Sequence, residues 1–391
     1  MLSGLIIFTV LLVMLLAGAP IAVSLGVSSI LAILPILNTQ ATVVTGAQRI
    51  FSGISVFSLL AIPFFILAGN IMNRGGIAIR LINLAKLVTG RIPGALAHTN
   101  AVANMLFGAI SGSGTAAASA MGSIIGPIEV EEGYDAEFSA AANIATAPTG
   151  LLIPPSNVMI TFSLVSGGTS VAALFMAGYI PGILWGLACM IVIYIFAKKK
   201  GYKSTSSFKG KEKLMVIWQA LPSLLMIVIV MPKIFRESAE MTGIIIFLIG
   251  VSSIMSWVMA FTDIPTLVSN ALLGISNNKY VIFFIINIIL LIVGTFMDMT
   301  PATLIFTPIF LPICQRLGMN VIHFGIMMIF NLCIGTITPP VGTTLFVGVK
   351  VGGTTIEKVI KPLLWYFAAI FAVLMLVTYV PQISLWLPGV M

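Results

Sequence analysis

The stretch GLLIPPSN at residues 150–157 has a counterpart, GTITPPVG, at residues 335–342, which lies 185 positions further along the chain. Other residues that shape the backbone keep the same offset without a gap. They are Thr115 and Thr300, Pro127 and Pro312, Gly133 and Gly318, and the Gly-Gly-Thr runs at residues 167–169 and 352–354. Because glycine and proline determine which backbone shapes are possible, these matches indicate a duplicated structural unit.

The composition indicates a helical membrane protein. Of 391 residues, 59% are hydrophobic and only 8% are charged, with a mean hydropathy of +1.15. A water-soluble chain with so few charges would expose large apolar patches. The apolar segments are long runs, which favours membrane helices over the short alternating strands of a barrel. Glycine and proline breaks inside such segments are typical of secondary transporters, whose sites lie where broken helices meet.

Several function classes are excluded by the sequence. The formal charge of +8 comes from basic residues at segment ends, so it does not indicate nucleic-acid binding. No phosphate-binding loop of the Gly-x-x-x-x-Gly-Lys type occurs, so energy must come from an ion gradient or from another subunit. No nucleophile–base pair or cluster of metal ligands is visible, and we therefore expect no enzyme activity.

The apolar runs and the basic clusters predict an organisation of two transport repeats within scaffold helices. The lysine-rich loop at residues 198–213 belongs on the cytoplasmic side by the positive-inside rule. The expected division is N-terminal scaffold helices at 1–75, an amphipathic connector at 76–93, repeat 1 at 94–170, scaffold helices at 171–263, a second connector at 264–278, repeat 2 at 279–355 and a C-terminal helix at 356–391. The run at 4–37 is either a pair of helices or one long tilted helix.

Each repeat is expected to contain a re-entrant hairpin followed by a broken helix. The run at 95–128 begins beside Arg91 and ends beside three glutamates, Glu129, Glu131 and Glu132, so both of its ends belong on the cytoplasmic side. Each arm of about fifteen residues rises only ~20 Å, which is too short for a core of ~30 Å. The first hairpin should therefore turn back at Ser111–Thr115. The repeat predicts a second hairpin at 280–311, with its tip near Asp298–Pro301, and broken helices at 136–165 and 321–349.

These breaks supply the groups that a site for a small cation and an organic anion needs. Prolines in the breaks release backbone carbonyls, the tips carry hydroxyls, and hard cations such as Na⁺ prefer oxygen ligands. The helix N-termini at the breaks carry partial positive charge that suits an anion. The candidate ligands of Na⁺ are Ser111, Ser113, Gly150, Pro154, Asp298, Thr300, Gly335 and Thr338. The candidate substrate-binding residues are Ser113, Gly114, Thr115, Ser156, Asn157, Thr300 and Gly342.

Each of these features also has a purely structural explanation. Glycines and serines at the first tip could be a face for close helix packing. The Pro-Pro pairs could be simple kinks. Asp298, the only carboxylate deep in an apolar run, could merely cap the helix that begins at Thr300-Pro301. The matched positions of the breaks in the two repeats favour a functional site.

The motifs resemble those of the large membrane subunit of the tripartite ATP-independent periplasmic (TRAP) transporters. The resemblance covers nearly the whole chain and is carried by residues 57–72, 110–114, 153–156, 174–178, 294–298 and 337–342. It implies an elevator-type fold with two inverted repeats in the bacterial inner membrane. It also implies Na⁺ coupling, a small four-helix membrane partner subunit, a periplasmic substrate-binding protein, contact with membrane lipid and carboxylate substrates such as C4-dicarboxylates, sialic acids or sugar acids. On this resemblance, Ser111–Thr115 and Gly150–Asn157 frame one ion site, and Asp298–Thr300 and Gly335–Gly342 the other.

One departure from the family pattern concerns the middle of the chain. Only two full spans, at 214–231 and 241–262, separate the cytoplasmic loop from the second hairpin, and an inverted second repeat needs an odd number. The family continues after the first of these spans with a glycine-rich turn and another helix, whereas here Val230 is followed directly by Met231-Pro232. We therefore expect about thirty residues, roughly one span, to be absent at this junction. A free-standing anion–Na⁺ symporter and an inactive remnant that lacks one span are the alternatives to a TRAP permease.

Overall fold

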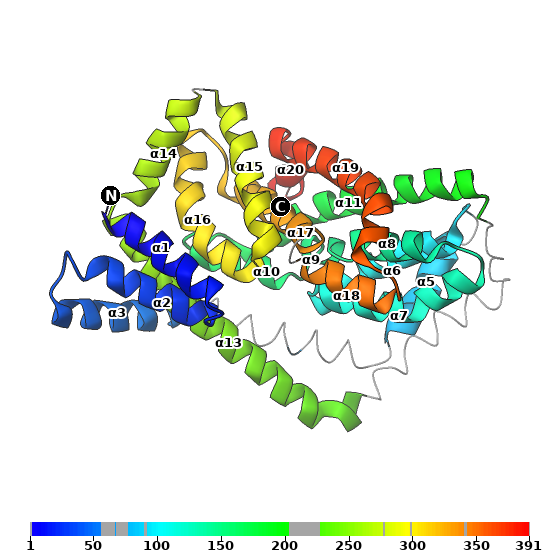
Figure 1. Cartoon of the computed structure of the whole chain (residues 1–391), viewed down its shortest axis with the longest axis horizontal. Coiled ribbons are helices and arrows are strands. Elements are labelled where there is room, and N and C mark those ends of the chain that lie inside the picture. The colour runs from blue at the N-terminus through cyan, green and yellow to red at the C-terminus, as the bar shows by residue number, and fades with distance from the viewer. Residues whose placement is uncertain are drawn as a thin grey trace.

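The computed structural model describes residues 2–55, 67, 77–89, 92–202, 227–276, 278–297, 299–339 and 342–390, and every regular element among them is a helix (Figure 1). Three helices in this part of the chain are long and apolar enough to cross a membrane, namely Val171–Lys200, Thr242–Phe261 and Ile356–Tyr379. A fourth candidate is the pair Ala136–Leu152 and Asn157–Val165, which is bent by 47° at its break. The chain is thus a helical membrane protein, as its composition predicted.

The N-terminal run forms two helices and not one long helix. Helix α1 (Leu2–Leu16) and helix α2 (Ile21–Ile33) pack against each other. Gly18 joins them with a φ of 78°, a conformation that glycine adopts without strain. Helix α3 (Thr39–Ile54) follows and was not among the apolar runs, because threonine, glutamine and arginine dilute its sequence.

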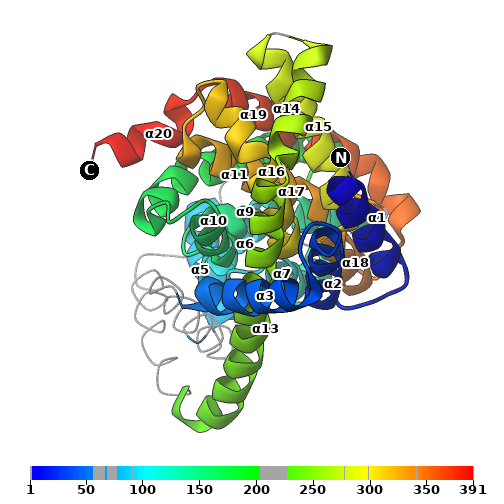
Figure 2. The ribbon, with the colours of Figure 1, turned by 90° about the vertical axis from the view of Figure 1, so that its left-hand side faces the viewer.

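Helix α13 (Ile227–Phe261) contradicts the expectation of two separate spans at 214–231 and 241–262. It is one continuous helix of 35 residues, so no turn separates its first residues from the apolar part that begins at Thr242. At 1.5 Å per residue it is about 52 Å long, well beyond the core of a bilayer. Its first part projects away from the rest of the molecule, and its apolar part packs against α2 and α3 (Figures 1 and 2). Residues 214–226 lie outside the described part.

The two repeats have corresponding helices in the same order, except that the short helix α9 (Thr149–Leu152) has no counterpart among the described residues of repeat 2. Repeat 1 contains α6 (Ala95–Ser111), α7 (Gly114–Glu131), α8 (Ala136–Thr146), α9 (Thr149–Leu152) and α10 (Asn157–Val165). Repeat 2 contains α15 (Lys279–Phe296), α16 (Met299–Arg316), α17 (Val321–Thr336) and α18 (Thr343–Val351). Helices α7 and α16 begin and end 185 residues apart, and α8 and α17 begin 185 residues apart. The offset read from the sequence is therefore also the offset of the helices.

The repeats pack against each other reciprocally. The second arm of the first hairpin, α7, contacts α18 of the other repeat, and the second arm of the second hairpin, α16, contacts α10. Each repeat thus places the last part of its broken helix against the hairpin of the other. A two-fold relation between two copies requires such an exchange.

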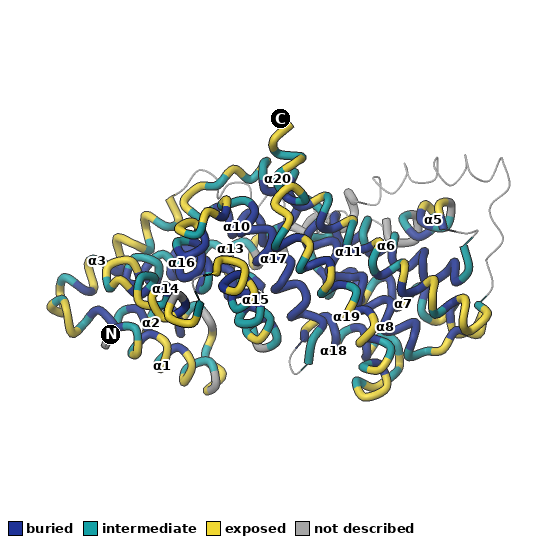
Figure 3. The backbone as a smooth tube through the Cα atoms, turned by 90° about the horizontal axis from the view of Figure 1, so that it is seen from above, coloured by how far each residue is buried: buried dark blue, intermediate teal, exposed yellow. Residues whose placement is uncertain are grey.

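The remaining helices flank this pair of repeats. Helix α5 (Ile77–Thr89) packs on α6, and α14 (Ile264–Ile275) packs on α16, so a helix lies at each predicted amphipathic connector. Helix α11 (Val171–Lys200) contacts helices of both repeats and also α19 (Ile356–Tyr379) and α20 (Gln382–Gly389). Figure 3 shows buried residues along α6, α8, α11 and α17. The indole N–H of buried Trp185 donates to the carbonyl of Ala145 at 2.8 Å, which fixes α11 to the first broken helix.

Candidate functional site

The tip of the first hairpin is a two-residue turn that faces the first helix break. Gly112 adopts a left-handed conformation with a φ of 62°. Ser113 caps α7, because its hydroxyl accepts a hydrogen bond from the N–H of Ala116 at 3.2 Å and lies 3.0 Å from the hydroxyl of Thr115. A methyl group added at Gly112 would lie 3.2 Å from the side-chain amide of Asn157. The tip and the start of α10 are therefore neighbours.

The same tip also contacts the second repeat. A methyl group added at Gly114 would lie 3.4 Å from the hydroxyl oxygen of Thr344, in the first turn of α18, and 3.4 Å from Cα of Pro148. Gly114 therefore lies where the first hairpin, the first break and the second broken helix meet. This junction joins parts of the chain more than 190 residues apart, and the repeat predicted it.

The first break is a short extended segment between two helices. Ile153, which follows α9, has β-type dihedrals, and the peptide bond between Pro154 and Pro155 is cis. Ser156 precedes α10, and its side chain is fully buried. Among the described residues the hydroxyl oxygen of Ser156 has no hydrogen-bond partner, although buried polar groups normally have one. A bound ligand would satisfy it.

The second break lies between α17 and α18, and Ile337, which follows α17, does not have the extended dihedrals of Ile153. Helix α17 ends at Thr336, and the hydroxyl of Thr338 donates back to the carbonyl of Ile334 at 2.7 Å. The N–H of Gly342 donates to the carbonyl of Thr338 at 3.1 Å, which closes the loop before α18. A methyl group at Gly342 would lie 2.7 Å from that carbonyl oxygen, so only glycine fits. Pro340 lies outside the described residues.

Gly150 and Gly335 occupy contact points between helices. Both were expected as carbonyl ligands, but Gly150 lies inside α9 and Gly335 inside α17. A methyl group at Gly150 would come under 3.0 Å from the backbone of Gly108, and one at Gly335 would come equally close to Gly294. In each repeat, then, the first arm of the hairpin touches the broken helix backbone to backbone. Close packing explains why glycine occupies both positions. Binding of Na⁺ by their carbonyls stays a prediction.

Buried asparagines hold the same pairs of helices together. They were not among the site residues predicted from the sequence. In repeat 1 the side-chain amide of Asn104 donates to the side-chain oxygen of Asn143 at 3.0 Å and to Thr146 at 2.9 Å. In repeat 2 Asn331 donates to the side chain of Asn287 at 2.7 Å and to its carbonyl at 2.9 Å. Asparagine inside apolar runs could have drawn attention to them, since such residues link membrane helices.

The second tip is described only in part. Asp298 lies outside the described residues, so the structure does not place this predicted ligand. Thr300 and Pro301 belong to the first turn of α16, and Thr300 is half-buried. Ser111 is the last residue of α6 and is also half-buried, with its hydroxyl 3.4 Å from the carbonyl of Ser113.

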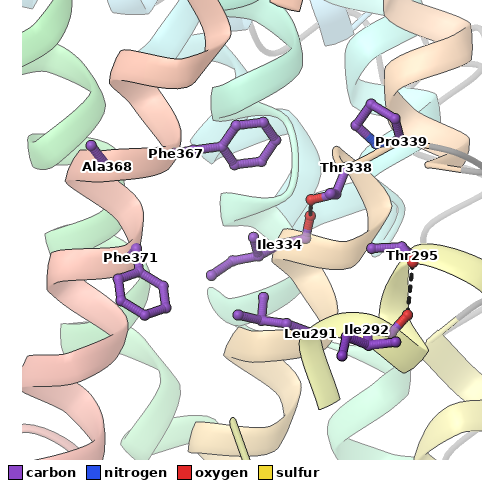
Figure 4. Close-up of a pocket in the computed structure, with 9 residues that line it drawn as sticks. All are labelled: Leu291, Ile292, Thr295, Ile334, Thr338, Pro339, Phe367, Ala368 and Phe371. Carbon is purple, nitrogen blue, oxygen red and sulfur yellow. Dashed lines mark hydrogen bonds between the residues drawn. The ribbon is translucent and has the colours of Figure 1, made fainter. Parts of the chain in front are cut away.

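A cavity of about 620 Å³ lies beside the second break (Figure 4). Its walls come from α15, from the end of α17 and from α19, and Thr295 and Thr338 are its polar side chains. Both hydroxyls donate to carbonyls of their own helices, at 2.7 Å in each case, as the dashed lines in Figure 4 show. The cavity is therefore apolar, and it offers no free polar side chain to an anion.

Glu129, which follows the apolar run of the first hairpin, is buried. Its side chain is fully buried in the last turn of α7 and accepts a hydrogen bond from Ser139 of α8. Among the described residues, no ion pair to Glu129 occurs. Its neighbours Glu131 and Glu132 are exposed.

Comparison with known proteins places the chain in a family. The family model "Tripartite ATP-independent periplasmic transporter, DctM component" matches residues 8–235 and 230–383. The uncharacterized protein YgiK of Salmonella typhimurium is 49% identical, over 96% of this chain and 95% of its own length. The isethionate TRAP transporter permease protein DctMQ of Oleidesulfovibrio alaskensis is 37% identical over 96% of this chain, which spans 65% of that relative.

A third relative aligns with this chain over nearly the whole length of both proteins. The C4-dicarboxylate TRAP transporter large permease protein DctM of Pseudomonas aeruginosa is 36% identical, over 94% of each chain. Both the family model and these relatives cover most of the residues that form the two repeats. The chain therefore belongs to the family of large permease subunits, the DctM components, of the tripartite ATP-independent periplasmic transporters.

Proposed function

We propose that this chain carries a small organic anion across the bacterial inner membrane together with Na⁺, and that it does so with a small four-helix membrane subunit and a periplasmic substrate-binding protein. Membership of the family makes the chain a transporter of the membrane and not an enzyme. The observation that carries the proposal is the junction at Gly114, where the first tip meets both broken helices.

The donor set at the first break fits a small hard cation. Ser156 presents a buried hydroxyl without a partner, and the hydroxyls of Ser113 and Thr115 lie across the tip. Oxygen atoms of hydroxyls and carbonyls are the ligands that hard cations take. We infer that Ser156, Ser113 and the carbonyls of the break hold one coupling Na⁺, and that Asp298, Thr300 and Thr338 belong to the other ion site.

The substrate is proposed to be a small molecule with an acidic group. Two relatives are named for isethionate and for C4-dicarboxylates, the first a sulfonate and the second carboxylates. The substrate class is therefore wider than the carboxylates expected from the sequence. Helices α7, α10 and α18 all begin around the junction, and the partial positive charge of helix N-termini suits either acid.

The reciprocal contacts of the repeats support an inverted arrangement. Helix α7 packs on α18 as α16 packs on α10. We propose that the two hairpins enter from opposite faces and that the repeats move as one body against α1–α3 and α13, in an elevator-type motion. In this proposal the repeats form the transport part, and α1–α3 and α13 belong to the scaffold.

Uptake by proteoliposomes tests the coupling. The chain, its small membrane subunit and a loaded binding protein are reconstituted, and uptake of labelled organic anion is measured with an inward Na⁺ gradient or an equal K⁺ gradient. We expect uptake only with Na⁺ and only with the binding protein. Equal uptake without the binding protein would indicate the free-standing symporter instead, and equal rates in K⁺ would refute Na⁺ coupling.

The Ser156→Ala variant tests the ion site itself. Removing a hydroxyl that has no protein partner should leave stability unchanged within about 1 kcal/mol, while the Na⁺ concentration for half-maximal uptake rises about tenfold. The matched control is Ser166→Ala, because the Ser166 hydroxyl is already bonded to Thr169. An unchanged Na⁺ dependence in Ser156→Ala would remove Ser156 from the site.

The relatives support the proposed absence of a segment in the middle of the chain. The alignment with YgiK runs over 412 positions, although 96% of this chain is only about 375 residues, so roughly 37 positions lie opposite gaps in this chain. The family model matches in two pieces that meet at residues 230–235. We propose that about thirty residues, roughly one span, are absent after Val230. If the chain as it stands shows no uptake and restoring the segment brings uptake back, the inactive remnant is favoured over the permease.

A further inference from the structure

The ends of two candidate spans place lysines on one face of the molecule. Helix α11 ends with Lys198, Lys199 and Lys200, and α19 carries Lys358 and Lys361 in its first two turns. The two helices pack side by side, and the rings of Phe196 and Trp365 meet edge to face with centroids 6.4 Å apart. The basic end of α11 therefore lies beside the basic start of α19. The positive-inside rule puts this face in the cytoplasm.

A pocket of about 310 Å³ lies between these two helix ends and the start of α8. Three lysines, two carboxylates and four aromatic rings line it, and of these rings only that of Trp365 is exposed. The residues around it are Asp135, Glu137, Phe138, Phe196, Lys200, Tyr202, Lys358, Lys361, Pro362 and Trp365. The pocket is thus polar at the lysines and apolar toward the middle of α19.

Ion pairing leaves two of the lysines available. Lys200 binds Asp135 at 2.9 Å, and its ammonium group lowers the pKa of the Asp135 carboxyl. Glu137 also acts electrostatically on Lys200. By contrast, Lys358 and Lys361 are exposed, and the described part of the chain contains no ion pair to either. Two of the three lysines in the pocket are thus outside any ion pair of the described residues, and Asp135 is held by Lys200.

An apolar surface continues from these lysines along α19. Leu364 and Trp365 follow Lys361 by one helical turn and are 58% and 63% exposed. On α11, Ile195 and Ile191 are also exposed, at 47% and 61%. Exposed apolar side chains next to the ends of membrane spans face acyl chains, and tryptophan prefers the level of the headgroups. The lysines thus suit the charged headgroup of a phospholipid, and the apolar surface next to them suits its acyl chains.

We propose that this pocket binds an anionic phospholipid of the cytoplasmic leaflet, with its phosphate between Lys358 and Lys361 and an acyl chain along Leu364 and Trp365. Basic pockets between membrane helices on this side are known to suit such headgroups. The bound lipid would bridge α11, which contacts both repeats, to α19. This inference does not depend on the substrate or the coupling ion of the transporter.

Quenching of tryptophan fluorescence by brominated acyl chains tests the site. The purified chain is placed in nanodiscs with increasing fractions of brominated phosphatidylglycerol or brominated phosphatidylcholine. Subtracting the signal of a Trp365→Phe variant isolates Trp365 from the other tryptophans. We expect half-maximal quenching of Trp365 at a fraction of phosphatidylglycerol about fivefold lower than that of phosphatidylcholine.

Charge variants give the decisive comparison. In the double variant Lys358→Ala with Lys361→Ala, the fraction of phosphatidylglycerol that gives half-maximal quenching should rise to the value for phosphatidylcholine. The double variant Lys358→Arg with Lys361→Arg keeps both charges and should keep the preference for phosphatidylglycerol. The control Lys198→Ala with Lys199→Ala removes two lysines from the same face but outside the pocket, and it should change nothing. Equal loss in the pocket and control variants would overturn the proposal in favour of a general surface potential. Displacement of the lipid by inorganic phosphate alone would overturn it in favour of a site for free anions.

Discussion

At the residue scale, the glycines that join each hairpin to its broken helix are the least replaceable positions. Gly150 touches Gly108, and Gly335 touches Gly294, so closely that a methyl group on either Gly150 or Gly335 would overlap backbone atoms. Backbone cannot move aside as a flexible side chain can. The hairpin would have to separate from the helix, and with it the tip at Gly114 would move.

We therefore expect Gly150→Ala to destabilise the protein by about 1–3 kcal/mol, the usual cost of overpacking, and to reduce uptake. Gly126→Ala is the matched control, since this glycine also lies within a hairpin helix but has nothing within 4 Å of an added methyl group. Thermal unfolding in detergent measures both. Equal melting temperatures for the two variants would show that the Gly108–Gly150 contact is looser than described.

Glu129 gives a second prediction at this scale. Its carboxyl is fully buried against Ser139 without a basic partner in the described part of the chain, and burying an unpaired charge is expensive. Glu129→Gln keeps the size and the hydrogen-bonding oxygen, so we expect a stability change below about 1 kcal/mol. Glu129→Lys places a charge in the same position and should prevent stable folding. If Glu129→Gln were as damaging as Glu129→Lys, the carboxylate charge itself would be needed.

At the scale of elements, each hairpin is held to its broken helix by buried asparagines as well as by glycines. Asn331 of α17 bonds Asn287 of α15, and Asn104 of α6 bonds Asn143 of α8. The same pair of elements is joined in both repeats, although the asparagines occupy different turns. The contact between hairpin and broken helix is thus kept in both repeats, although the position of the bond along the helices differs.

A double-mutant cycle measures this connection. We expect Asn287→Ala and Asn331→Ala each to destabilise the protein, and their effects to be coupled by about 0.6–1.7 kcal/mol, the range found between membrane helices. Asn320→Ala with Asn278→Ala serves as the comparison, because each of these residues only caps its own helix. Strictly additive effects of the first pair would mean that the bond does not contribute.

Many of the helices and their ends could be predicted from the sequence. Gly133 and Gly318 both end a hairpin arm with positive φ, of 88° and 83°, as their matched positions implied. Helix α3 was missed because its apolar residues are interspersed with polar ones. The continuity of α13 was missed because Pro232 to Glu240 is a polar stretch, and polarity alone does not end a helix that projects from the body.

At the scale of the whole molecule, the sequence predicted which segments converge but not how they are held. The breaks at 150–157 and 335–342 and the first tip were found because glycine and proline report backbone shape directly. The roles of Gly150, Gly335 and the asparagines depend on which helices are neighbours, and spacing along the chain does not contain that information. Nor could the burial of Glu129 be read from its exposed neighbours Glu131 and Glu132.

The sidedness of the molecule gives a further prediction. An inverted arrangement of the two repeats needs an odd number of membrane crossings between them. The segment proposed to be absent after Val230 would supply the missing crossing. With about thirty residues of YgiK restored there, cysteines at Lys233 and Lys358 should both react from the cytoplasmic side. Labelling with a membrane-impermeant maleimide in cells and in inverted vesicles measures this. A functional chain without the insertion, with Lys233 outside and Lys358 inside, would contradict it.

The central claim is that the two repeats meet at one site, and a cross-link between Gly114 and Thr344 tests it most directly. With Cys189, Cys314 and Cys333 replaced, cysteines are introduced at both positions, where an added carbon at Gly114 lies 3.4 Å from the Thr344 side chain. We predict rapid disulfide formation on mild oxidation of the membrane-embedded protein, seen as a mobility shift that reductant reverses. Absence of the cross-link, while a control pair in the contacting helices α15 and α17 forms its own, would contradict the account.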